Sequence, residues 1–219
     1  ATAGAPAEAA PTRPNDARSF ATKLVLVADE GLTVVSDIDD TVKITEVTDK
    51  KRLLRRTFGM PFEVVPGMGA AYAQWVDAEA HLHFVSSSPW QLFAPLSELM
   101  HRSGFPVATY DLKRVRPRDV RKTTEALLAP PLATKPPAIR ALLERFPKRR
   151  VVLVGDSGEK DPEVYGLFAR ERPQQVARVY IRDVTGEPRS AARYAAAFEG
   201  VPADKWTLFS HASELPAAP

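Results

Sequence analysis

The sequence predicts an α/β protein with a doubly wound parallel sheet in a single domain over residues 20–219. From residue 20 onward, short apolar runs alternate with longer segments of helical period, which is typical of strands joined by crossover helices. Several apolar runs end in polar residues, and ligands of such sheets bind at the carboxyl ends of the strands. With 44% hydrophobic residues among 219, the chain can bury a core.

Each element follows from a local pattern. Short apolar runs predict strands at Thr33–Ile38, Leu82–Ser86, Val107–Tyr110, Arg150–Val154 and Val176–Ile181, and a weaker one at Trp206–Phe209. Helical periodicity predicts helices at Gly67–Glu79, Pro89–Ser103, Arg118–Leu128, Pro136–Phe146 and Pro162–Glu171, and a weaker one at Arg189–Phe198. Ser88 is expected to cap the helix that Pro89 begins, with Gly104 just past its end.

Two segments are expected to lie outside this core. Residues 1–19 are rich in Ala, Pro, Thr and Asn, with almost no large apolar side chain, so we expect a flexible leader. An insertion over residues 42–66 follows the first predicted strand and carries five cations within Lys50–Arg56. We expect it to form a small lid, or to lie on an anionic bilayer. A second basic group begins at Lys113 and Arg114, near the same edge of the sheet.

Composition excludes several classes of protein. No apolar stretch approaches the roughly 18 residues that cross a bilayer, and the absence of cysteine excludes disulfides, thiolate zinc sites and a cysteine nucleophile. A net charge of +3 is too small to indicate a nucleic acid partner, and none is expected. His81 and His83 share one face of a strand and are expected to flank the sheet rather than bind metal, and Trp90, Phe93 and Leu96 are expected in the core.

The first strong strand ends in an acidic segment, Ser36-Asp37-Ile38-Asp39-Asp40-Thr41. Three acids at the end of an apolar strand must be solvated, paired or placed on a metal. Because side chains alternate along a strand, Asp37 and Asp39 can face the same side, about 6 to 7 Å apart. Two carboxylates at that spacing suit a nucleophile and a proton carrier around one phosphorus atom, and a solvated turn is the alternative.

A second acidic strand end contains Asp156 and Asp161. If its strand is a neighbour of the first, Asp156 joins Asp37 at one mouth of the sheet. Hard oxygen ligands in that number indicate Mg²⁺, which also bridges to a substrate phosphate. Without a cation, the clustered carboxylates would repel one another and any phosphate.

Four further residues are candidates for binding the substrate phosphate. Ser86 is the first polar residue after its strand, where a helix is expected to begin and an anion can be held. Ser87 is a second hydroxyl there, or fills the turn. Lys43 and Lys135 are candidate cations, although Lys135 taken alone reads as an ordinary surface lysine.

These residues resemble the four motifs of the haloacid dehalogenase superfamily of phosphohydrolases. The motifs match Asp37-x-Asp39-x-Thr41, Ser86, Lys135 and the segment 155–161. More narrowly, the segments 36–43, 86–92 and 155–165 resemble the catalytic domain of actin-patch-type, lipin-related phosphatidate phosphatases, and the resemblance covers roughly residues 31–181. Lipins carry Gly at the position of Asp40, so this residue matches no lipin role.

The resemblance implies a haloacid dehalogenase-like fold, with the insertion as its lid, and an aspartyl-phosphate mechanism. Asp37 would attack phosphorus, while Asp39 would protonate the leaving alcohol and then activate water. The implied ligands of Mg²⁺ are the carboxylates of Asp37 and Asp156 and the backbone carbonyl of Asp39, with Asp161 in the inner or outer shell. Ser86 and Lys135 would neutralise the phosphoryl oxygens.

Three functions remain open on the sequence. The first is a Mg²⁺-dependent phosphomonoesterase acting on phosphatidate or a similar phospholipid, in peripheral contact with an anionic membrane. The second keeps this chemistry but acts on a soluble phosphate ester, such as a nucleotide or sugar phosphate. The third is a non-catalytic module that binds anionic lipids, which the complete acid set disfavours.

Overall fold

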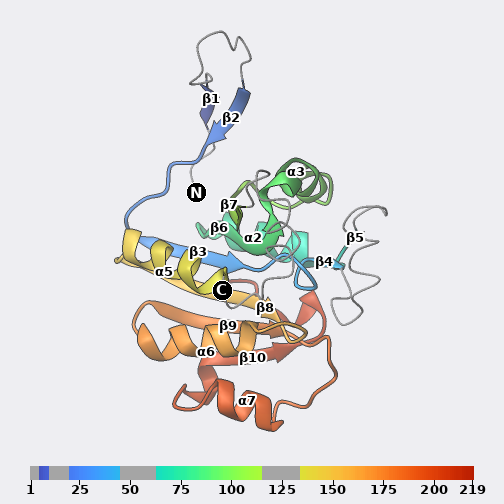
Figure 1. Cartoon of the computed structure of the whole chain (residues 1–219), viewed down its shortest axis with the longest axis vertical. Helices are drawn as coiled ribbons and strands as arrows, with labels where there is room; N and C mark the ends of the chain where they lie inside the picture. Colours follow the sequence, from blue (N-terminus) through green and yellow to red (C-terminus); the bar gives the residue numbers. More distant parts are fainter. Residues whose placement is uncertain (1–4, 10–19, 45–62, 115–133) are drawn as a thin grey trace, which may run out of the picture.

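A six-stranded parallel sheet forms the centre of the protein (Figure 1). The computed structural model describes residues 5–9, 20–44, 63–114 and 134–219. The strand order is β10-β9-β8-β3-β6-β7, and all neighbouring pairs are parallel. The strands are β3 (Gly31–Ser36), β6 (His81–Pro89), β7 (Ala108–Lys113), β8 (Arg149–Asp156), β9 (Val176–Arg182) and β10 (Trp206–Phe209). Because the order runs outward from β3 in both directions, the predicted doubly wound sheet is confirmed.

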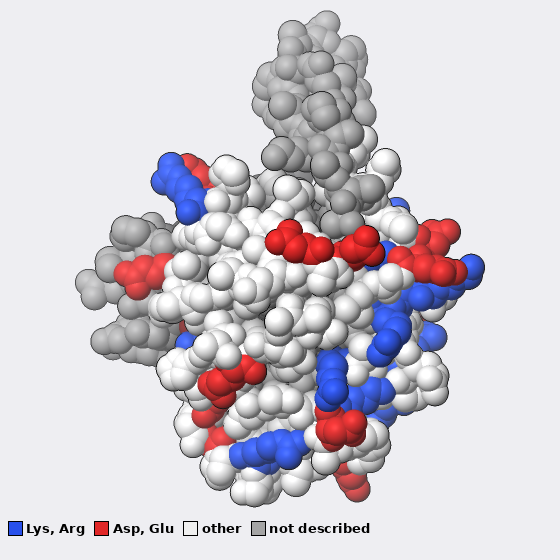
Figure 2. Space-filling view, turned by 180° about the vertical axis from the view of Figure 1, so that it is seen from behind, with Lys and Arg blue, Asp and Glu red and all other residues white. Residues whose placement is uncertain are grey.

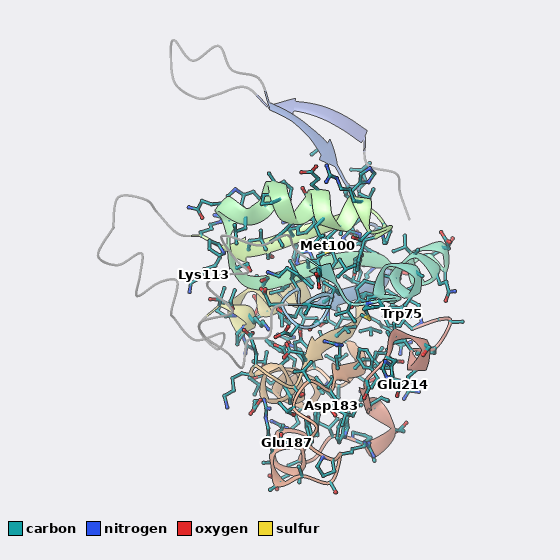
Figure 3. The ribbon with its side chains drawn as sticks, turned by 90° about the vertical axis from the view of Figure 1, so that its right-hand side faces the viewer. Trp75, Met100, Lys113, Asp183, Glu187 and Glu214 are labelled. Atoms are coloured by element: carbon teal, nitrogen blue, oxygen red, sulfur yellow. The ribbon has the colours of Figure 1, made fainter. Side chains whose placement is uncertain are left out.

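Helices cover both faces of this sheet. They are α2 (Met68–Asp77), α3 (Phe93–Arg102), α5 (Lys135–Arg145), α6 (Asp161–Glu171) and α7 (Ala192–Ala197). Val34 of β3 belongs to the core cluster with α2 and α3, whereas Val35 belongs to the one with α5, α6 and α7. Trp75 and Met100, labelled in Figure 3, are buried in the first cluster. Adjacent residues of one strand therefore serve opposite layers, as the alternation of a strand requires.

Two short antiparallel pairs lie apart from the main sheet. β1 (Ala5–Ala9) pairs with β2 (Phe20–Leu24), so part of the segment expected to be a flexible leader forms a strand. β4 (Lys43–Ile44) pairs with β5 (Glu63–Val64) at the base of the insertion. Residues 45–62, which carry the predicted lid or bilayer contact, lie outside the described residues.

The region after β6 differs from the prediction. The strand continues through Pro89, which has the extended φ of −62° and ψ of 145° and pairs with Lys113 of β7. A 3₁₀ turn, η1 (Trp90–Leu92), follows, and α3 begins only at Phe93. Ser88 therefore does not cap a helix. Trp90 is 48% exposed, so its expected place in the core was wrong, whereas Leu96 is buried as expected.

The remaining sequence expectations have mixed outcomes. The strand Trp206–Phe209 has the predicted bounds, and the other predicted elements are present with shifted ends, except the helix Arg118–Leu128, which lies outside the described residues. His81 and His83 flank the sheet as expected, because both lie within 2.8 Å of the Thr109 hydroxyl on the neighbouring strand. Among the described residues, no helix is both long and apolar enough to span a membrane.

Charged side chains are mixed in sign on the face turned away from the viewer in Figure 1. Figure 2 shows this face, with Lys and Arg interspersed among Asp and Glu around a broad uncharged area. On the right-hand side of this view the Lys and Arg atoms gather in a band, with Asp and Glu atoms above and below it.

We expect Gly166→Ala to destabilise the protein by about 1 to 3 kcal/mol through overpacking. A Cβ at Gly166 would lie 1.9 Å from the carbonyl oxygen of Ala197, so α6 and α7 would have to separate. Urea unfolding measures the change, with Ala195→Ser on the exposed side of α7 as the control, expected within about 0.5 kcal/mol of wild type. Equal stability of the two variants would contradict this close approach of the helices.

Candidate active site

The predicted acidic residues meet at the carboxyl ends of β3 and β8. Asp37 directly follows β3, and its backbone N–H donates to the carbonyl of Val154 on β8 at 2.9 Å. Asp156 ends β8, and Asp161 begins α6. All three carboxyl groups are buried, and one oxygen from each lies within 4.8 Å of the others. The strand adjacency on which the sequence argument depended is therefore present.

Lys135 lies at the centre of this acidic group. It is the first residue of α5 and is fully buried, so the ordinary surface lysine is excluded. Its Nζ is close to three carboxylates: 2.9 Å from Asp37 Oδ1, 2.5 Å from Asp161 Oδ1 and 3.0 Å from Glu159 Oε2. One ammonium thus faces four acids when Asp156 is included. The cluster carries more negative than positive charge, which a bound cation would offset.

The pKa values of the cluster reflect burial and this crowding. Burial raises the pKa of Asp37 well above its usual value; Lys135 opposes this shift, and the neighbouring carboxylates add to it. The pKa of Asp156 is raised for the same reasons, with Asp161 the largest charged contributor. Burial lowers the pKa of Lys135, but Asp161, Asp37 and Glu159 more than reverse this and keep the amine protonated. Without a cation, these carboxyl groups therefore resist ionisation together.

The donor set fits a hard divalent cation. Asp156 Oδ1 accepts backbone hydrogen bonds from Gly158 at 2.6 Å and Glu159 at 3.1 Å. Its other oxygen, Oδ2, is buried and has no hydrogen-bond partner among the described residues. A buried carboxylate oxygen without a partner, beside two further carboxylates, is the kind of ligand that Mg²⁺ takes. Sequence-predicted Asp37, Asp156 and Asp161 would supply these oxygens.

Asp39 lies in a second cluster, beside the first. Its carboxyl group is 2.6 Å from Lys43 Nζ and accepts hydrogen bonds from Ser88 at 2.8 Å and Ser86 at 3.2 Å. Ser86 and Lys43 are therefore at the site but contact the second acid. The side-chain hydroxyl of Ser87 is buried without a partner in the described part of the chain. The predicted metal contact of Asp39 uses its backbone carbonyl and stays a prediction.

The turn after β3 shows what the backbone requires at Asp40, the position at which lipins carry Gly. This residue has a φ of 53°, in the left-handed region that Gly adopts most easily and Asp tolerates better than most residues. Its carbonyl accepts a 2.6 Å hydrogen bond from Arg182 at the end of β9. The turn returns the chain so that Thr41 Oγ1 lies 3.3 Å from Asp37 Oδ2. Asp40 thus shapes the backbone of the motif.

Gly155 permits Asp161 to enter the cluster. A Cβ at this position would lie 2.3 Å from Asp161 Oδ2 and 2.6 Å from a ring carbon of Tyr165. Without that Cβ, the backbone N–H of Asp156 reaches Asp161 Oδ2 at 3.2 Å. In this Gly-Asp pair, Asp156 is a candidate metal ligand, and Gly155 leaves the space that the side chain of Asp161 occupies.

Sequence reasoning missed several residues of the site. Glu159 stands inside the acidic motif, and its charge could have marked it as a partner of Lys135. Ser88 was assigned to a helix cap, which hid its contact with Asp39. Arg182 and Arg193 lie far along the chain and contact backbone carbonyls of the two acidic loops, so no local pattern marks them.

Comparisons with known proteins point to one family. The family model "Phosphatidate phosphatase APP1, catalytic domain" matches residues 32–183. The chain is 33% identical over 160 residues to phosphatidate phosphatase APP1 of Saccharomyces cerevisiae, covering 71% of this chain and 26% of that protein. It is 27% identical over 173 residues to the uncharacterized protein C29B5.04c of Schizosaccharomyces pombe, covering 78% of this chain and 28% of that one. The chain thus spans about a quarter of the length of these relatives.

Among solved structures, the chain is similar to a proposed beta-phosphoglucomutase from Thermotoga maritima. The identity is 15% and the TM-score 0.47, and the match covers 83% of this chain and 95% of that one.

We expect Asp156→Asn to raise the stability of the metal-free protein by about 1 kcal/mol or more, because it removes one of the buried like charges. Since the folded-state pKa of Asp156 is raised, wild-type stability falls as pH rises above the ordinary carboxyl value, and the advantage of Asn grows from pH 4 to pH 7. Thermal unfolding with chelator at both pH values measures this.

Mg²⁺ is expected to reverse the order of the two proteins. At a concentration one hundred times the Kd, it would stabilise the wild type by about 2.7 kcal/mol and the variant much less. An equal response of both proteins to Mg²⁺ would contradict the assignment of Asp156 as a ligand.

Proposed function

We propose that this chain, which belongs to the family of the phosphatidate phosphatase APP1 catalytic domain, is a Mg²⁺-dependent phosphatase of phosphatidate or a closely similar phospholipid. The observation that carries the proposal is the buried cluster in which the carboxylates of Asp37, Asp156 and Asp161 meet, with the Lys135 ammonium against Asp37 and Asp161 and with Asp39 beside it. This arrangement suits phosphoryl transfer, because a purely anion-binding surface gains nothing from buried carboxylates.

Asp37, Asp156 and Asp161 are the proposed side-chain ligands of the metal, with the Asp39 carbonyl as a further one. When bound, Mg²⁺ would offset the excess negative charge and draw electron density from the phosphoryl oxygens. Lys135 remains protonated in this environment and lowers the repulsion between the carboxylates and an incoming phosphate.

Asp37 is the proposed nucleophile. One of its carboxylate oxygens forms a bond to phosphorus as the bond from phosphorus to the lipid alcohol breaks, which gives an aspartyl phosphate. Thr41 and Lys135 contact separate oxygens of this carboxylate, 3.3 Å from Oδ2 and 2.9 Å from Oδ1, and so fix its plane. A fixed carboxylate attacks with less loss of freedom than a mobile one.

Asp39 is the proposed proton carrier. Its proton passes to the departing alkoxide, and in the second step it accepts a proton from the water that hydrolyses the aspartyl phosphate. Three donors, Lys43, Ser86 and Ser88, hold its carboxyl group from two different strands. The acid is therefore positioned independently of the cluster around Asp37.

The surface next to Asp39 supports a lipid substrate over a soluble ester. Trp90 follows Ser88 by two residues, is 48% exposed and stacks on Phe93 with ring centroids 5.0 Å apart. Lys113, paired with Pro89 on the neighbouring strand, adds a cation. An exposed indole next to a cation is suited to the headgroup region of an anionic bilayer. We propose that the protein contacts its membrane here while phosphatidate enters the site.

We expect phosphate release from phosphatidate in mixed micelles to require Mg²⁺ and to stop with chelator. Asp37→Asn should lower kcat by at least about a thousandfold, since it removes the nucleophile, and Asp39→Asn by about 10² to 10⁴. Asp204→Asn, at an exposed position, is the control and should match wild type.

The same assay separates the alternative functions. Equal turnover of phosphatidate and of soluble sugar or nucleotide phosphates, with or without a lipid surface, would favour a soluble substrate. Lipid binding without phosphate release from any ester would favour the non-catalytic module and overturn the proposed enzyme.

We expect vesicles containing phosphatidate to shift the tryptophan emission to shorter wavelength. Of the three tryptophans, Trp75 is fully buried and Trp206 is 8% exposed, so Trp90 would dominate the response. The binding measurement uses Asp37→Asn protein, so that no substrate is consumed. Trp90→Ala should remove the shift and, in active protein, lower the ratio of vesicle to soluble-ester turnover about fivefold or more.

Val107→Ala is the matched control for the Trp90 variant. Val107 is also 48% exposed but precedes β7, at the opposite end of the strands from the site. A shift that persists in Trp90→Ala, or an equal fall of the ratio in Val107→Ala, would contradict a membrane contact at Trp90.

A further inference from the structure

We propose that Arg193 of α7 is a positioning residue that orients the metal-ligating carboxylate of Asp156 through the Ser157–Gly158 peptide. The inference rests on the proposed function, because it concerns how the Mg²⁺ site is kept in shape. Arg193 lies outside residues 32–183, the part of the chain that the family model matches. Its role therefore concerns a part of this chain that the family pattern does not describe.

The guanidinium of Arg193 joins the acidic loop to two helices. It donates hydrogen bonds to the carbonyl oxygens of Ser157 and Glu159, in the loop between β8 and α6. It also forms a two-pronged ion pair with Glu163 of α6, with Nε 3.1 Å from Oε1 and Nη2 3.1 Å from Oε2. The side chain is only 23% exposed, so these contacts are shielded from water on most sides.

The planarity of the peptide bond links Arg193 to Asp156. The carbonyl of Ser157 and the N–H of Gly158 belong to one trans peptide unit and point to opposite sides of it. Arg193 holds the carbonyl, so the N–H is directed the other way, where it donates to Asp156 Oδ1 at 2.6 Å. The loop peptide transmits the position of the guanidinium to the carboxylate.

This orientation determines which oxygen of Asp156 is left for a ligand. Gly158 and Glu159 both donate their N–H groups to Oδ1, and Oδ2 is the buried atom without a partner among the described residues. A rotated Ser157–Gly158 peptide would withdraw the shorter of these two hydrogen bonds and free the carboxylate to turn. Groups that orient a metal ligand in this way commonly contribute tenfold or more to metal affinity.

Arg193 also acts on Lys135 through the neighbouring residue. The Glu159 whose carbonyl it binds reaches Lys135 with its own carboxylate, at 3.0 Å. One guanidinium therefore fixes two consecutive parts of the loop, one facing the proposed ligand and one facing the central cation. Displacement of Arg193 would loosen both.

Arg170 provides a matched comparison. It is an arginine of α6 that binds two carbonyls at the end of α7, Ala197 at 2.7 Å and Glu199 at 3.1 Å. Both arginines thus connect α6 with α7, but the loop contacts recorded in the structure belong to Arg193. Substitution of Arg170 removes contacts between α6 and α7 only. Substitution of Arg193 removes contacts between these helices and also the contacts with the acidic loop.

The test compares Arg193→Gln, Arg193→Lys and Arg170→Gln in the full chain. The first readout is the Mg²⁺ concentration that raises the Tm by a fixed amount, because this stabilisation grows with the logarithm of the concentration. The second is the Mg²⁺ concentration that gives half-maximal phosphate release. We expect Arg193→Gln to raise both concentrations about tenfold or more, with kcat at saturating Mg²⁺ recovering to within about threefold of wild type. Arg193→Lys keeps the positive charge but loses the forked guanidinium, so its two Mg²⁺ concentrations should lie between those of wild type and Arg193→Gln.

Arg170→Gln is expected to lower the Tm without changing either Mg²⁺ concentration more than about twofold, because it leaves the loop contacts intact. Equal shifts of the Mg²⁺ concentrations in Arg170→Gln and Arg193→Gln would overturn the proposal and leave a purely structural role. An unchanged Mg²⁺ response in Arg193→Gln would also overturn it. If Arg193→Gln does not fold, the Arg193→Lys titration decides by the same criteria, with an increase of about threefold or more as support.

Failure of the proposed function is distinguishable from failure of this inference. If wild-type protein is stabilised by Mg²⁺ but releases no phosphate from phosphatidate, the proposed function fails, and the Tm titrations alone decide the role of Arg193. If wild-type protein shows no response to Mg²⁺, the positioning role is overturned as well.

Discussion

The site depends on a balance of charge among buried carboxylates and one buried ammonium group. Carboxylates from β3, β8 and α6 lie close together around one ammonium, and their burial makes mutual repulsion costly. Lys135 offsets part of this repulsion, and backbone N–H groups offset more at Asp156. The negative charge that is not offset favours a bound cation. The repulsion that destabilises the metal-free protein is therefore also what makes the site attractive to a metal ion.

The parallel sheet determines which residues can take part in this balance. β3 lies between β8 and β6, so residues far apart in the chain emerge at one edge. Val34 and Val35 anchor β3 in opposite layers, which leaves little freedom for the acidic turn that follows. The two acids of that turn then point into different surroundings, Asp37 toward Lys135 and Asp39 toward Lys43. Their separate surroundings suit separate roles in one reaction.

Much of this arrangement could be predicted because it depends on local pattern and on the rule that strand ends converge. The acids at positions 37, 39, 156 and 161 each follow an apolar run or open a helix. The structure brings the carboxylates of Asp37, Asp156 and Asp161 together, with that of Asp39 in the cluster beside them. Ser88 and Trp90 were misjudged because the pairing of β6 with β7 extends through Pro89, and cross-strand pairing overrides a local capping signal. The contacts of Arg193 depend on a side chain that meets a distant loop in the folded protein, which one sequence does not reveal.

The family model ends at residue 183, but the folded layers continue beyond it. β10 adds the outermost strand beside β9, and α7 brings Tyr194 and Ala197 into the second core cluster. A polypeptide trimmed to residues 32–183, the range of the family model, would retain every carboxylate of the cluster, yet would uncover the side of α6 against which α7 rests. The boundary of the folding unit is therefore set by what must be covered, and it lies further along the chain than the end of the family model.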